Sequence, residues 1–272
     1  MISDIAKVSR IRRDLTLAAI LQAVFIGASI LAVLIGPRLG LPMNGALVLL
    51  VVAIIWTALW FRSIKGSRLA SDSPSLIAMG RFDEAEHQID AAIRSFSLFR
   101  AAKLVSLHHL AVLRHAQRRW RESAMLCKAL LAQRLGSLRA ISRPSLLLLA
   151  DDLLQLNDLP GAYMALRGLF EQNLGLVESL SLLGLQLDYL ARVQQWDAML
   201  AGLPSKVQLA ELMPSAPSAR SQALLALAAR KSSRQELSQW LARRAQTLVD
   251  PTTLVTERPF LSPLWPDVAV PA

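Results

Sequence analysis

The chain has 272 residues, and its 30 basic residues outnumber its 20 acidic ones, so the formal net charge is +10. Hydrophobic residues make up 53% and charged residues only 18%, whereas a soluble domain is usually about 45–50% apolar and about 25% charged. These values exclude a disordered chain and disfavour an entirely soluble one. A single cysteine, Cys127, excludes a disulfide framework and a cysteine-rich zinc site.

Two uncharged stretches near the N-terminus, residues 15–35 and 43–61, are each long enough to cross a bilayer as a helix. The connecting residues 36–42 contain two glycines and two prolines, which end both helices and force an antiparallel transmembrane hairpin. Small residues recur at every fourth position of the first stretch, at Ala19, Ala23 and Gly27, and would let a second helix approach closely. Residues 1–68 are therefore predicted to form a basic N-terminus and a membrane anchor.

Basic residues flank the hairpin mainly on the side of the two termini. Four precede the first stretch and three follow the second, while the loop holds only Arg38, so both termini are expected to be cytoplasmic. A cleaved signal peptide is the rival interpretation. It is disfavoured because the first apolar run exceeds the usual length and a second run follows at once. We expect an integral membrane protein with two spans, and a bacterial inner (cytoplasmic) membrane is the setting that such a compact chain favours.

Residues 69–249 carry a pattern that repeats every 37 to 39 residues. Each repeat places a helix start just after a glycine or polar turn, and a small or apolar residue follows three positions later. A steady spacing of this length predicts helix pairs stacked as an α-solenoid, about five pairs in all, and an all-α fold. The five helix starts are Phe82, Trp120, Leu159, Trp196 and Arg234.

The first repeat resembles the tetratricopeptide repeat (TPR) family. The residues that match the family pattern are Gly80, Phe82, Glu84, Ala85, Ile89 and Ala92. Later repeats depart from it, because Ser123 and Met199 replace the alanine and Arg234 replaces the aromatic residue. The resemblance implies a scaffold for protein–protein interaction and brings no catalytic residues with it.

The last segment, residues 250–272, contains five prolines and is predicted to be a Pro-rich extended tail without helix. Its apolar residues either cap the last repeat or dock on a partner. The cap is favoured, because the end of a stack of repeats otherwise exposes apolar surface.

Positive charge is concentrated in the first 150 residues. Residues 1–68 hold eight basic and two acidic residues, and residues 69–150 hold twelve and six. The densest group surrounds Trp120 and includes Arg118, Arg119 and Arg121. It is interpreted as a solvated face, as a contact for anionic lipid headgroups or as a site for an acidic protein segment. Nucleic-acid binding is disfavoured, because no recognised motif accompanies the charge.

No motif of an active site is found in the sequence. Phosphate-binding loops, nucleophile elbows and zinc-binding helices are absent. His108 and His115 share one face of a helix, but no cysteine or carboxylate ligand accompanies them nearby. We predict that the chain is not an enzyme and has no cofactor or metal. The predicted partner-binding residues are Lys103, His108 and Arg114, on the inner-helix side of repeats two and three.

Together these features predict a membrane-anchored TPR-like scaffold or adaptor that mediates protein–protein interaction on the cytoplasmic face. The alternative is a non-catalytic subunit of a membrane enzyme or transport complex, bound through its transmembrane hairpin.

Overall fold

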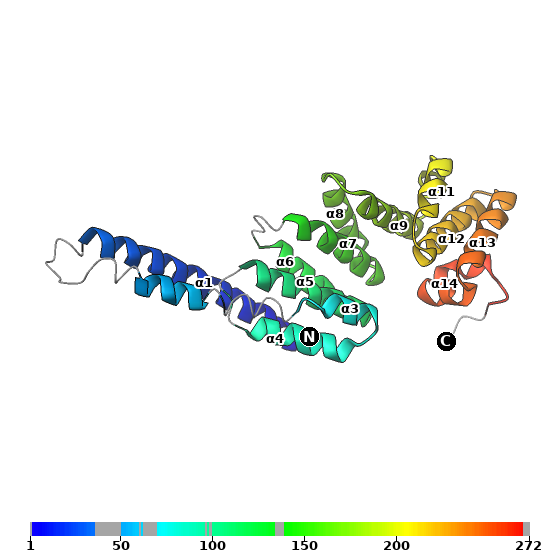
Figure 1. The fold of residues 1–272 in the computed structure, drawn as a ribbon. Helices are drawn as coiled ribbons and strands as arrows, with labels where there is room; N and C mark the ends of the chain where they lie inside the picture. The colour runs from blue at the N-terminus through cyan, green and yellow to red at the C-terminus, as the bar shows by residue number, and fades with distance from the viewer. Residues whose placement is uncertain are drawn as a thin grey trace. The chain divides into compact units, whose positions relative to one another are not determined.

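The computed structural model describes residues 2–35, 50–59, 61, 70–95, 97, 100–133 and 139–268. Within them every regular element is a helix and none is a strand, which confirms the predicted all-α class. Two compact units are present, Met1–Ser145 and Leu146–Ala272. The helices are α1 (Ile2–Ile35), α3 (Ser73–Ala78), α4 (Phe82–Arg94), α5 (Arg100–Ala116), α6 (Trp120–Leu131), α7 (Arg139–Gln155), α8 (Leu159–Phe170), α9 (Leu176–Arg192), α10 (Trp196–Leu200), α11 (Leu203–Glu211), α12 (Ser215–Lys231), α13 (Gln235–Leu248), α14 (Pro251–Glu257) and the 3-10 helix η3 (Pro259–Leu264) (Figure 1).

The same turn joins the two helices of each repeat. One residue in it has a positive φ between 58° and 75°, and a new helix begins two residues later. The residue after it donates a backbone hydrogen bond of 2.8–2.9 Å to the carbonyl five positions earlier, which is the Schellman helix ending. The five turn residues are Gly80, Arg118, Asn157, Gln194 and Ser233. Because their spacing follows the repeat in the sequence, each turn residue lies between the two helices of one repeat, and the described residues contain five such pairs.

The third residue after each helix start is buried in every repeat. Its side chain lies where the second helix of the pair crosses the first, so a small or flexible side chain is needed there. Ser123 fits because its hydroxyl donates to the Ala111 carbonyl at 3.0 Å, and the unbranched Met199 fits because it can fill an irregular gap. The five residues are Ala85, Ser123, Ala162, Met199 and Ser238, each at most 4% exposed.

Two details differ from the sequence prediction. The fifth turn lies at Ser233, so α13 begins at Gln235 and Arg234 caps it instead of starting it. In the fourth repeat the second helix stops at Leu200, because Gly202 takes a left-handed conformation (φ 64°) before α11. The proline of α11 lies in its first turn, where a missing N–H costs nothing.

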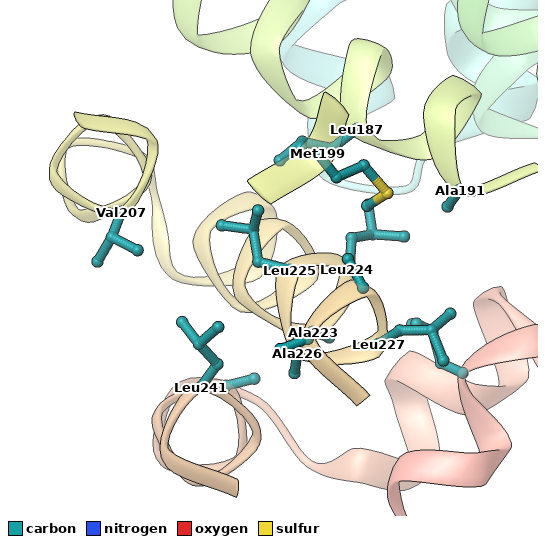
Figure 2. Packing of buried hydrophobic residues seen from close by; sticks show 14 of the residues in the cluster. Leu187, Ala191, Met199, Val207, Ala223, Leu224, Leu225, Ala226, Leu227 and Leu241 are labelled. Atoms are coloured by element: carbon teal, nitrogen blue, oxygen red, sulfur yellow. The ribbon is translucent and has the colours of Figure 1, made fainter. Parts of the chain in front are cut away.

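Helix α12 is the centre of unit two. Its residues 221–229 are all buried, and side chains of α9, α10, α11 and α13 gather around it (Figure 2). Such an environment explains its sequence: alanines such as Ala223 and Ala226 allow close approach of α13, while Leu224 and Leu225 fill the space toward Met199.

The C-terminal segment is not extended, so that part of the prediction is wrong. Proline is tolerated in the first turn of a helix, and Pro251 begins α14, with the Asp250 carboxylate accepting a hydrogen bond from the Thr252 N–H at 2.8 Å. The preferred cap is confirmed, because η3 packs on α12 and Leu261 is fully buried.

The N-terminal helix α1 is 34 residues long and contains the first predicted span. The predicted second span, 43–61, is described only at residues 50–59 and at Phe61, and the loop 36–42 lies outside the described residues. The helical segment 50–59 runs beside α1, and the rings of Phe25 and Trp56 stack with centroids 5.3 Å apart (Figure 1). No helix within the described part of the chain combines the length and apolarity of a membrane crossing.

Candidate functional site

One stripe of α1 is less exposed than the rest of the helix. The stripe residues are spaced alternately by three and four positions in the first half of the helix, which is the spacing of one helix face. They are Asp4, Lys7, Ile11, Asp14 and Ala18, followed by Gln22, Phe25 and Ser29. Asp4, Lys7 and Asp14 form ion pairs with α4 and α5 of unit one, α1 also contacts α6, and Phe25 contacts the segment 50–59. We call the first five residues the docking stripe.

The guanidinium of Arg114 lies at the centre of the docking contact and is 1% exposed. Its Nε donates to Asp4 Oδ2 at 2.8 Å and its Nη2 to Asp4 Oδ1 at 3.1 Å. It also donates to both carboxylate oxygens of Glu86, at 2.6 and 2.9 Å, and to the Gln117 side-chain oxygen at 2.8 Å. A planar guanidinium can hold two carboxylates in this way. The buried cation therefore links α1 to α4 and α5.

Lys103 forms the second charged contact with α1, three turns before Arg114 on α5. Its ammonium group donates to Asp14 Oδ2 at 3.3 Å and to the backbone carbonyls of Ile93 and Ser95. A third stripe residue, Lys7, pairs with Asp90 of α4 at 2.7 Å. Since Asp4 meets Arg114 and Asp14 meets Lys103, α1 runs antiparallel to α5.

The pKa values of these groups follow from their partners. Although burial raises the pKa of Asp4, the hydrogen bonds and charge of Arg114 lower it overall. Hydrogen bonds from Arg114 lower the pKa of Glu86 to about 2. Burial alone would lower the pKa of Arg114, but its two carboxylate partners raise it. The cluster is therefore fully charged at neutral pH, and acid would break it by protonating Glu86 and Asp4.

Two adjacent histidines on α5 contact serines of neighbouring helices. His109 Nδ1 lies 2.9 Å from Ser73 Oγ on α3, and His108 Nδ1 lies 2.9 Å from Ser145 Oγ on α7. Burial, followed by the charge of His109, lowers the pKa of His108 to about 4. Both serines are 0% exposed. The two pairs therefore connect neighbouring helices in the interior of the fold.

The three arginines of the predicted lipid or acidic-partner patch lie at the turn between α5 and α6. Arg118 is the left-handed turn residue and is exposed, as is Arg121. Arg119 is also exposed and pairs with Glu122 one turn further along. This group is on the surface, unlike Lys103 and Arg114, which α1 covers. Partner binding by Lys103, His108 and Arg114 and ligand binding by the surface patch stay predictions.

Unit two has its own buried charged cluster, in which the C-terminal segment supplies the cation. Arg258 is 5% exposed, and its Nε donates to Asp188 Oδ2 at 2.7 Å. Its Nη2 lies 3.6 Å from Asp151 Oδ1. Asp151 and Asp188 hold the same position in repeats three and four, six residues before the left-handed turn residue. Arg192 completes the cluster by donating to Asp188 at 2.8 Å.

The exposed side of α1 changes character along the helix. In the first half it is formed largely by polar and basic residues such as Ser9, Arg12 and Arg13. In the second half the exposed residues are mainly large and apolar. They are Leu17, Ile20, Leu21, Val24, Ile26 and Ile30. The segment 50–59 continues this surface, with Leu50 and Ile54 each about 60% exposed.

Candidate metal ligands do not converge in the described residues. Groups of three metal-ligating side chains are not found among them, and Cys127 is buried. Comparison of the chain with protein-family models, with curated proteins and with solved structures gives no match.

Sequence reasoning did not find the acidic partners Asp4, Asp14 and Glu86. A signal for the first two exists: the positions 4, 7, 11, 14 and 18 follow the three-four spacing of a packed face, although three of the five are charged. Charged residues at such positions indicate a partner of opposite charge.

Proposed function

We propose that the chain is a membrane-anchored scaffold whose TPR-like helix pairs bind another protein at the cytoplasmic face, with a bacterial inner membrane as its setting. The hairpin fixes the chain in the bilayer, and the repeats present a surface to the partner. Tethering confines a weak interaction to a surface and so raises its effective concentration.

The observation that carries the anchor is the apolar exposed surface of α1 beyond Arg13. Leu17, Ile20 and Val24 are 56%, 58% and 62% exposed, and side chains of this kind are normally buried. A helix whose outward face is apolar and whose packed face includes Gln22 and Ser29 has the polarity expected in lipid. The uncharged stretches 15–35 and 43–61 of the sequence extend this surface.

The proposed orientation of the chain in the membrane follows from the exposed side of α1, which is polar and basic up to Arg13 and apolar beyond it. Residues 2–14 of α1 dock on the repeats, so the repeats lie on the side of the basic residues Arg10, Arg12 and Arg13. Basic residues flank spans on the cytoplasmic side. The repeats would therefore be cytoplasmic, close to the headgroups of the inner leaflet.

The second candidate function is that of a non-catalytic subunit bound to a membrane complex through the hairpin. A specific observation favours it: Ala19, Ala23 and Gly27 are exposed on α1, and a Cβ added at Gly27 would meet no atom within 4 Å. Small residues spaced by four let transmembrane helices approach closely. No atom of the described residues would obstruct the helix of another subunit at Gly27.

Membrane fractionation tests the anchor. The full chain should stay with membranes after extraction at alkaline pH and be released by detergent. Recovery in the aqueous fraction would contradict the proposal.

An exchange of residues 19–61 for an unrelated two-span hairpin separates the two functions. This exchange keeps Asp4 and Asp14, which a deletion of residues 1–68 would remove from their buried partners. Capture of the same partner after crosslinking in membranes would favour the scaffold, whereas loss of capture would favour the subunit.

A further inference from the structure

The contact between α1 and the repeats depends on charge more than on apolar burial. Of the five residues of the docking stripe, only Ile11 and Ala18 are apolar, at 3% and 5% exposed. The other three are Asp4, Lys7 and Asp14, and each is paired with a charge on α4 or α5. A permanent helix contact would normally use apolar residues at these positions.

The two buried cations keep partners of their own if α1 leaves. Arg114 retains Glu86 and Gln117, which belong to the repeats. Lys103 retains the carbonyls of Ile93 and Ser95. A buried charge without a partner is very costly, and here neither cation would lose all its hydrogen bonds. The surface is therefore built to release α1.

The spacing of the two buried cations on α5 matches the spacing of the two carboxylates on α1. Asp4 and Asp14 are ten residues apart on α1, a rise of about 15 Å, and Lys103 and Arg114 are eleven apart on α5, a rise of about 16.5 Å. Two carboxylates on one helix thus match two cations on an antiparallel helix. Between the two aspartates α1 carries the buried Ile11, which is 3% exposed.

We propose that this surface of α4 and α5 is a binding site for an acidic helix of a partner protein, and that the first half of α1 is a competing internal ligand. The occupant is a helix with two carboxylates about ten residues apart and an aliphatic residue before the second. The proposal rests on the scaffold function above and names the chemistry of its partner. Release of α1 exposes Lys103 and Arg114, and the partner replaces the two aspartates.

A designed peptide tests the site on the full chain in detergent. The probe is a helical peptide of 17 residues, all alanine except at four positions. These four carry the side chains of Asp4, Lys7, Ile11 and Asp14 at the same spacing as in α1. A fluorophore on the peptide allows its binding to be measured by fluorescence anisotropy. We expect it to bind the double variant Asp4→Asn, Asp14→Asn at least about tenfold more tightly than the wild-type chain. Added salt should weaken this binding.

Two controls make the result specific. Arg13→Gln changes an exposed residue of the same helix and should leave peptide affinity at the wild-type value. A peptide with both aspartates replaced by asparagine should not bind. The single variant Asp14→Asn, whose partner Lys103 keeps two carbonyls, replaces the double variant if the latter fails to fold by circular dichroism.

Equal affinity of the peptide for the wild type and a folded variant would overturn the proposal, as would equal binding of the asparagine peptide. These outcomes are independent of the membrane fractionation. The chain can be recovered in the aqueous fraction while the peptide still binds, which would contradict only the anchor. The peptide can also show no binding while the chain stays in the membrane, which would contradict only the binding site.

Discussion

Both ends of the described chain fold back onto helix pairs, but different forces hold them. The N-terminal helix meets unit one through the ion pairs of Asp4, Asp14 and Lys7, and its docking stripe includes only two buried apolar residues. The C-terminal segment places Leu254, Val255 and Leu261 at 3%, 0% and 0% exposure in unit two. A charged contact responds to salt, pH and a competitor, whereas an apolar one is part of the core. The N-terminal contact is suited to exchange and the C-terminal one to permanence.

The two contacts also have opposite polarity. In unit one the repeats supply the two buried cations and the terminal helix supplies the carboxylates that face them, while Lys7 of the terminal helix pairs with Asp90. In unit two the repeats supply Asp151 and Asp188, and the terminal segment supplies Arg258. The repeats of unit one therefore bind a terminal segment through buried cations, and those of unit two through carboxylates.

The largest expected effect is at the C-terminal contact. Leu261→Ala removes a fully buried side chain from the core of unit two and should lower the free energy of unfolding by about 2–5 kcal/mol. Urea denaturation followed by circular dichroism measures it. The matched control is Leu212→Ala, which alters a side chain that is 63% exposed and should change stability by less than about 0.5 kcal/mol. Similar losses in the two variants would show that the segment is not part of the core.

Arg258→Met should have the next largest effect. It keeps the apolar stem of the side chain and removes the charge that faces Asp188, so we expect a loss of about 1.5–3 kcal/mol. Arg192 still pairs with Asp188 and limits the loss. The same denaturation measurement applies, with the exposed Arg243→Met as control. A stability equal to that of the control would contradict the buried charged cluster.

Acid should weaken the buried charged cluster around Arg114 in a defined range. Glu86 has an ordinary pKa of 4.5 that Arg114 lowers to about 2, so its stabilising effect is complete above pH 4.5 and lost as the pH falls toward 2. Asp4, also lowered, adds a loss of the same sign. The melting temperature of the full chain should fall over this range, and less steeply in Glu86→Gln. Identical pH profiles would contradict the cluster.

The repeats were largely predictable because their signals are local. Each repeat has a glycine or polar turn residue, a helix start two residues later and a small or apolar residue three positions after that start. This pattern predicts four of the five turns at the correct residue, and the fifth lies one residue away, at Ser233. The break after Leu200 depends on Gly202, whose left-handed conformation a repeat alignment does not report. The tail was mispredicted because its prolines were counted without regard to position, although Pro251 occupies a first turn.

The docking of α1 was not predictable from charge counts. Lys103 and Arg114 belong to a chain segment rich in basic residues, and their carboxylate partners on α1 lie 89 and 110 positions away in the chain. Such pairings are non-local. The three-four spacing of the docking stripe was the one signal in the sequence that indicated a packed face.

The most direct test of the account is the accessibility of labels along the exposed side of α1 in the membrane-bound chain. Nitroxide labels would be placed singly at Ser9, Arg13, Leu17, Ile20 and Val24. The account predicts that a water-soluble relaxation agent reaches the first two and that oxygen, which concentrates in lipid, reaches the last two, with the change near Leu17. A label at Val24 that is as accessible to the water-soluble agent as one at Ser9 would contradict it.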